Sequence, residues 1–180
     1  MTTTARGFSR PVRRSLLVLH VITSVGWLGV TLADLALAVT VATTTDPLLQ
    51  HSVYRVLEVI GTVVLLPISA SAFLTGVALS LGTPWGLVRH RWVLIKFVLT
   101  AVTVALTYLS LVPGLREAGD IVANTAPGEL ANVQESNLLV AACVSTSVYT
   151  FNVVLSVVKP FGRTRRGSRT PARRRAPVAA

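Results

Sequence analysis

Apolar residues in this chain gather into four long, sparsely charged blocks rather than into short amphipathic repeats. The blocks cover about 16–42, 53–81, 92–112 and 137–158. Each block holds the roughly 20 helical residues that are needed to cross the core of a bilayer. This pattern predicts an all-α fold, namely an integral membrane four-helix bundle.

Proline and glycine mark the expected breaks in these blocks. Pro67 falls near the middle of the second block, where we expect a kink rather than a break, because neighbouring groups can satisfy the freed carbonyl. A polar loop is expected at 43–52, and Pro113-Gly114 is expected to end the third span. The loop at 115–136 is too polar to cross a membrane, although it has room for a short interfacial helix.

Basic residues predict how the four spans are oriented. The chain has 180 residues with 17 Lys and Arg and a net charge of +10. All but Arg55 and Arg116 fall at the termini, in the loop between the second and third spans or at the start of the third span. The positive-inside rule therefore places both termini in the cytoplasm. The predicted parts are a basic cytoplasmic arm at 1–14, a four-span domain at 15–159 and a disordered basic tail at 160–180. Such a protein belongs in a bacterial cytoplasmic membrane.

The same charge pattern favours anionic lipids as partners of the Arg-rich termini over nucleic acid. An N-terminal signal peptide is disfavoured, since the first apolar block is about twice as long as a signal core. Cys143 is the single cysteine, so the sequence excludes an intramolecular disulfide and the usual zinc spacings. Hydrolase and nucleotide-binding motifs are also missing. The residues are compatible with an enzyme and with a non-catalytic protein, and with a homo-oligomer.

Each span carries small or polar residues at helical spacing. In the first span they are His20, Ser24, Trp27, Thr31 and Asp34, which share one helix face. Similar stripes follow Lys96 in the third span and Ser145 in the fourth, whereas that of the second span is looser. Most of the hydroxyl groups are expected to serve helix packing.

Charged residues within spans are costly, so they deserve separate explanations. Asp34 lies near the outer end of span one, and Arg55 and Glu58 lie at the start of span two. We expect these three residues to approach one another. They form either a structural clamp or a proton or ion relay.

His20 and Lys96 lie in one layer near the cytoplasmic end of their spans. His20 is either a packing histidine or a ligand for haem or a metal, since neutral imidazole is a common axial ligand. Lys96 either extends to the lipid headgroups or joins that site. His90 is a further candidate, whereas His51 belongs to the opposite face of the membrane.

The segments LHVITSVGWLG and RWVLIK resemble motifs of a branch of four-span bacterial membrane proteins of actinobacterial type. This branch is similar to the copper-resistance D-type proteins and the HemJ-type protoporphyrinogen oxidases. The resemblance implies that His20 is a haem-associated histidine. It also implies that Trp92 and Lys96 match the Trp and Lys that open a later span in those proteins. A second intramembrane histidine and a Met-rich or His-rich copper relay are missing, so copper transport is disfavoured.

Three functions therefore stay open. The first is a redox site for haem b or another porphyrin, held by His20, Lys96 and Trp92 on the cytoplasmic side. The second is a small transporter or proton-conducting protein that uses Asp34, Arg55 and Glu58. The third is a non-catalytic membrane partner that docks through its basic tail.

Overall fold

The computed structural model describes residues 8–82, 87, 90–133 and 135–158, and every regular element among them is helical. The helices are α1 (Arg10–Thr43), α2 (Pro47–Val59), α3 (Leu66–Gly82), α4 (Arg91–Leu106), α5 (Val112–Asn124) and α6 (Glu135–Val158). Two π-helical segments, η1 (Ile60–Leu65) and η2 (Thr107–Leu111), join α2 to α3 and α4 to α5. The chain therefore forms four helical rods, as the apolar blocks predict.

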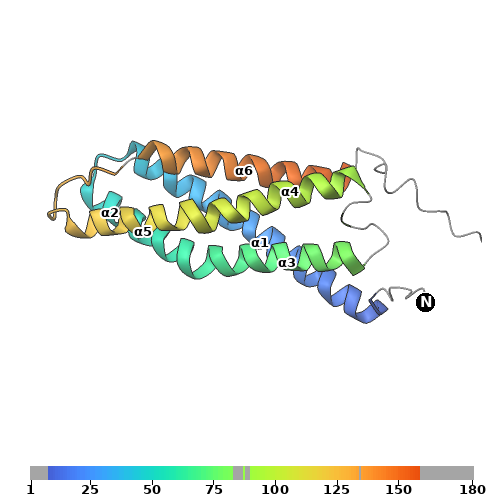
Figure 1. Cartoon of the computed structure of the whole chain (residues 1–180). Helices are drawn as coiled ribbons and strands as arrows, with labels where there is room; N and C mark the ends of the chain where they lie inside the picture. The colour runs from blue at the N-terminus through green and yellow to red at the C-terminus, as the bar shows by residue number, and fades with distance from the viewer. Residues whose placement is uncertain (1–7, 83–86, 88–89, 134, 159–180) are drawn as a thin grey trace, which may run out of the picture.

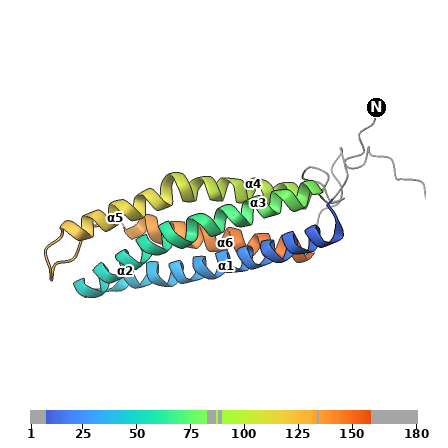
Figure 2. The ribbon, with the colours of Figure 1, turned by 90° about the horizontal axis from the view of Figure 1, so that it is seen from below.

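The four rods pack side by side in a closed bundle (Figure 1). Helix α1 packs against α3 and α6, and α4 packs against the same two helices from the other side. Figure 2 shows α1 and α4 at opposite edges of the bundle. We call the end with Gly82, Arg91 and Val158 the terminal end, and the end with Thr43 and Pro47 the distal end.

All four rods are long and apolar enough to cross a membrane, which confirms this part of the prediction. Their bounds are wider than the predicted spans: α1 begins at Arg10 inside the predicted basic arm, with Pro11 in its first turn. Helix α2 begins at Pro47, where the Asp46 carboxylate accepts a hydrogen bond from the Leu48 amide at 2.9 Å. The predicted loop at 43–52 is therefore reduced to a few residues around Thr44. The predicted tail at 160–180 lies outside the described residues.

Pro67 and Pro113 do not interrupt their rods. The helix continues across Pro67, as expected, and a π-helical segment precedes it. The helix does not end at Pro113-Gly114, where the third span was expected to end, because the rod runs on to Asn124. A π-helical segment comes just before this proline too. A wider turn accommodates a residue that has no N–H to donate.

The distal part of the bundle has its own core. Buried residues of α2 and α5 recur every three or four positions, which is the pattern of amphipathic helices. Together with the end of α1 they form one hydrophobic cluster. This cluster contains Val41, Tyr54, Leu57, Leu115 and Val122. The buried Gln50 amide bonds both backbone groups of Ala131, at 3.2 and 2.8 Å, and so fastens the following loop onto α2. A second cluster around Trp27 and Tyr149 fills the middle of the bundle.

Candidate functional site

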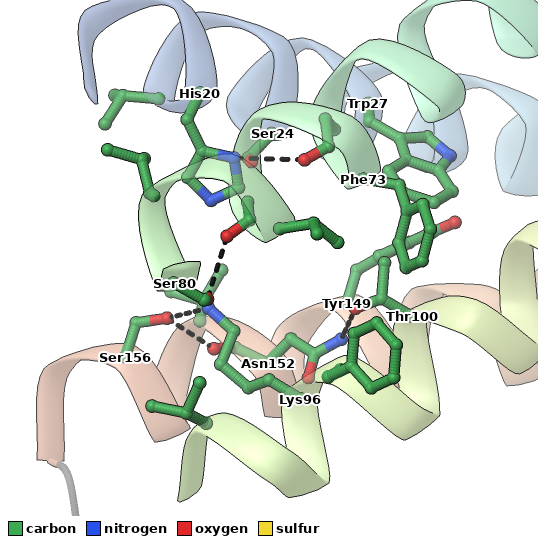
Figure 3. A pocket seen from close by; sticks show the side chains of 18 of the residues that line it. His20, Ser24, Trp27, Phe73, Ser80, Lys96, Thr100, Tyr149, Asn152 and Ser156 are labelled. Carbon is green, nitrogen blue, oxygen red and sulfur yellow. Dashed lines mark hydrogen bonds between the residues drawn. The ribbon is translucent and has the colours of Figure 1, made fainter. Parts of the chain in front are cut away.

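A cavity of about 740 Å³ lies between α1, α3, α4 and α6 in the terminal half of the bundle (Figure 3). The predicted site residues His20, Lys96 and Trp92 all line it. Most of the other lining side chains are apolar. The structure therefore brings together the residues that the sequence predicted for a cofactor site.

The imidazole of His20 is held by the facing helix. Its Nδ1 lies 3.1 Å from the Ala72 carbonyl and 3.1 Å from the Thr75 hydroxyl. Thr75 itself donates to the Ser71 carbonyl at 2.6 Å, so both partners act as acceptors for His20. In the neutral ring the proton therefore belongs on Nδ1, and the lone pair of Nε2 is available to a ligand.

Gly76 makes room for this ring. A Cβ atom at Gly76 would lie 3.0 Å from Cε1 of His20, which is closer than ordinary van der Waals contact. The sequence shows Gly76 only as a member of a loose polar stripe. Its role depends on the distance between α1 and α3, which spacing along the chain does not specify.

Lys96 approaches the cavity from α4 and has a defined partner on α6. Its ammonium donates to the Ser156 hydroxyl, which in turn donates to the Asn152 carbonyl at 2.8 Å. Arg13 also lines the cavity, and no Asp or Glu of the described chain does so. The cavity is thus apolar in its walls and cationic in its charged groups.

Aromatic side chains form much of the remaining wall. Phe73 and Phe97 stack with ring centroids 5.7 Å apart, and the rings of Trp27 and Tyr149 lie 4.3 Å apart at 55° (Figure 3). Sequence reasoning missed Arg13 and the two phenylalanines. Phe97 directly follows Lys96, but an aromatic residue in a span gives no signal by itself, because most such residues face lipid or core.

The predicted approach of Asp34, Arg55 and Glu58 is only partly observed. Arg55 pairs with Glu58 on its own helix at 3.5 Å, and its side chain is 57% exposed. Among the described residues, neither Arg55 nor Glu58 forms an ion pair with Asp34. Glu58 instead packs over Gly119 of α5, and Asp34 lines a second, smaller cavity. The expected clamp between the first two rods is therefore wrong in its Asp34 to Arg55 contact.

The other two histidines do not line the large cavity. His51 lies at the distal end, with its Nε2 3.0 Å from the Glu129 carbonyl. His90 precedes α4, and its ring centroid lies 6.5 Å from that of Trp92. In the described part of the chain, no three His, Cys, Asp or Glu residues come together as a metal site.

Comparisons with known proteins found no significant similarity. No protein-family model matches the sequence, and neither a curated protein nor a solved structure is significantly similar to the chain. The function has to be argued from the cavity and its side chains.

Proposed function

We propose that the protein spans a bacterial cytoplasmic membrane four times, with both termini in the cytoplasm. Four apolar rods support this placement, together with Arg10, Arg13 and Arg14 at the terminal end. The rods that run from Pro47 to Gly82 and from Arg91 to Asn124 are about 50 Å long, whereas the hydrocarbon core measures about 30 Å. Helices α2 and α5 would therefore project beyond the outer surface.

In this placement, the charged residues of the rods lie at different depths in the membrane. Arg55 lies about 40 Å along its rod from Gly82, which is beyond the hydrocarbon, where an exposed guanidinium meets water. Asp34 lies about 30 Å from Arg14 and so reaches only the outer margin of the core. His20 and Lys96 stay in the inner half.

We propose further that the large cavity would hold haem b or a closely related porphyrin, with His20 as the residue that would bind its iron. The observation that carries this proposal is the contact of His20 Nδ1 with the Ala72 carbonyl at 3.1 Å. Histidines that bind metals usually donate their second ring N–H to a carbonyl or carboxylate, which fixes the tautomer and the ring orientation. His20 has this arrangement before any ligand is added.

The size and charge of the cavity agree with this ligand. A volume of about 740 Å³ lies in the range of pockets that enclose cofactors, roughly 300–1,000 Å³. Aromatic and aliphatic walls suit the porphyrin ring, while Arg13 and Lys96 supply cations for its two propionates. Because Lys96 acts as a hydrogen-bond donor to Ser156, we assign it to a propionate rather than to the iron. Bound haem would supply one-electron redox chemistry.

The test is the haem content of protein purified from membranes in detergent, measured as the pyridine haemochrome. We expect haem in the wild type and its loss in His20→Ala. His51→Ala is the matched control, because His51 lies at the distal end, and it should keep the wild-type content. A wild type without haem, or an unchanged content in His20→Ala, would refute the proposal.

A transport function has weaker support. Two of the three residues proposed for a relay, Arg55 and Glu58, are engaged with each other. Asp34 alone lines a cavity within the bundle, which favours an ion or proton role for this residue only. Docking through the basic tail stays a separate proposal, since the tail lies outside the described residues.

A further inference from the structure

A second cavity, of about 20 Å³, is lined by Asp34. Its walls come from α1, α2, α5, α6 and the two π-helical segments. Oδ1 of Asp34 is buried and has no hydrogen-bond partner among the described residues. A buried carboxyl oxygen without a partner is rare, so it calls for a ligand that the protein does not provide itself.

No basic side chain of the described chain lines this cavity. Arg55 is paired with Glu58, and Lys96 is bonded to Ser156 in the other cavity. Tyr149 is the other titratable group in the wall. A buried carboxylate without a basic partner is unfavourable, and a bound cation or a proton would neutralise its charge.

Two hydroxyl groups in the cavity wall are oriented as acceptors, whereas Nε1 of Trp27, also in the wall, is a buried donor that has no partner among the described residues. The Thr31 hydroxyl donates to the Trp27 carbonyl and that of Thr107 to the Thr103 carbonyl, both at 2.9 Å. The protons of these two hydroxyl groups are therefore engaged in hydrogen bonds, and their oxygen lone pairs are available to a bound cation. Ser145 adds a third hydroxyl group to the wall. Carboxylate and hydroxyl oxygens are hard ligands, which suit small hard cations.

The backbone around this cavity is also unusual. Leu65 belongs to η1, and Thr107 and Leu111 belong to η2, so both π-helical segments contribute to its wall. Such segments often occur at functional sites in helices. Irregular helix turns at membrane depth are tolerated where they line a cavity or an ion site.

We propose that Asp34 holds one monovalent cation in this cavity, either a proton on its carboxyl group or a bound Na⁺. A volume of about 20 Å³ accommodates one water molecule or one monatomic ion, and nothing much larger. Trp27 and Tyr149 line both cavities and lie between them. The cation site is therefore separate from the proposed haem site and does not depend on it.

Infrared spectroscopy of the full chain in detergent tests the proton form. At neutral pH, the wild type should show the C=O band of a protonated carboxylic acid. The band should be lost in Asp34→Asn and retained in Glu58→Gln, which removes a carboxyl group outside the cavity. If Asp34→Asn does not accumulate, Asp34→Glu replaces it, because it should shift the band instead of removing it.

Thermal unfolding tests the sodium form. The wild type is heated in NaCl and in choline chloride at equal ionic strength, and a bound Na⁺ should raise the Tm in NaCl only. This difference should vanish in Asp34→Asn and persist in Glu58→Gln. Either the carboxylic acid band or the sodium effect, if specific to Asp34, supports the proposal. A wild type that shows neither of them overturns it.

Discussion

His20 illustrates how one residue acquires a role from its neighbours. Its sequence context identifies a histidine on a polar helix face, whereas the structure adds an acceptor pair at Nδ1 and a glycine beneath the ring. The acceptor pair at Nδ1 leaves Nε2 available to a ligand. The glycine lets α1 and α3 approach each other closely. Both details are needed before a ligand role for His20 follows.

Gly76→Ala tests the packing under that ring. The added methyl group would meet Cε1 of His20 at 3.0 Å, so the ring has to move by a few tenths of an ångström. We expect haem to bind several-fold more weakly, as measured by titration of the apoprotein. Gly29→Ala, whose new methyl group meets nothing within 4 Å, is the control and should bind like the wild type. Equal loss in both variants would argue against a specific effect on His20.

Lys96→Met tests the assignment of the ammonium to a propionate. Hydrogen bonds to charged groups contribute about 1.5–3 kcal/mol, so the variant should bind haem at least tenfold more weakly. Haem dimethyl ester, which has no free carboxylates, should bind the variant and the wild type with similar affinity. If Lys96→Met weakens the binding of the ester as much as it weakens the binding of haem, Lys96 acts on the iron or on packing instead.

The incorrect Asp34 to Arg55 contact also has a residue-scale cause. Buried positions of α2 include Tyr54 and Leu57, which turns Arg55 away from the bundle and toward Glu58 one turn later. Sequence depth estimates place Asp34 and Arg55 near each other along the membrane normal but say nothing about the direction of each side chain. The apolar stripe of α2 contained that information, since it recurs every three or four residues.

At the scale of elements, the two prolines show which part of the fold follows from the sequence. The helices themselves are predictable from their apolar blocks, and the continuation across Pro67 is too. Pro113 was expected to end a helix, yet the preceding turn widens into a π-helical segment and the helix continues. Val112, Leu115 and Val122, which are buried in α5, recur at helical spacing in the sequence. This spacing indicates a helix, but the polar residues between them suggested a loop.

Glycine substitutions in η1 and in α5 test how closely these two segments pack. Gly114→Ala meets nothing within 4 Å and should stabilise the protein by about 0.5–1 kcal/mol, because alanine favours a helix over glycine. Gly61→Ala would meet the buried Leu115 at 2.8 Å, so overpacking of about 1–3 kcal/mol should offset or reverse that gain. Thermal unfolding in detergent measures both. A larger gain for Gly61→Ala would contradict the observed packing of η1 on α5.

For the whole molecule, the arrangement separates three zones along one bundle. A cationic cavity lies in the terminal half, a small acidic cavity lies beyond the Trp27 and Tyr149 pair, and amphipathic helices close the distal end. The sequence predicted the rods, and it placed His20 and Lys96 in one layer. It did not reveal the cavities, because a cavity arises from the distances between helices rather than from spacing along them.

The proposed orientation makes a prediction about lipid binding. Deleting 161–180 removes seven arginines, each of which contributes about 1 kcal/mol near an anionic surface. The truncated protein in detergent should bind anionic vesicles much more weakly than the full chain, with little difference on neutral vesicles. Its haem content should stay unchanged. Equal binding of both forms to anionic vesicles would remove the tail as a lipid-binding segment.

Binding of haem b by the bundle through His20 can be measured by a visible titration of the apoprotein. We expect saturation at about one haem per chain, with a Soret band distinct from that of free haem. The band should be absent in His20→Ala and present in His51→Ala. A wild type that does not saturate, or a His20→Ala variant with the same titration curve, would show that His20 does not bind haem.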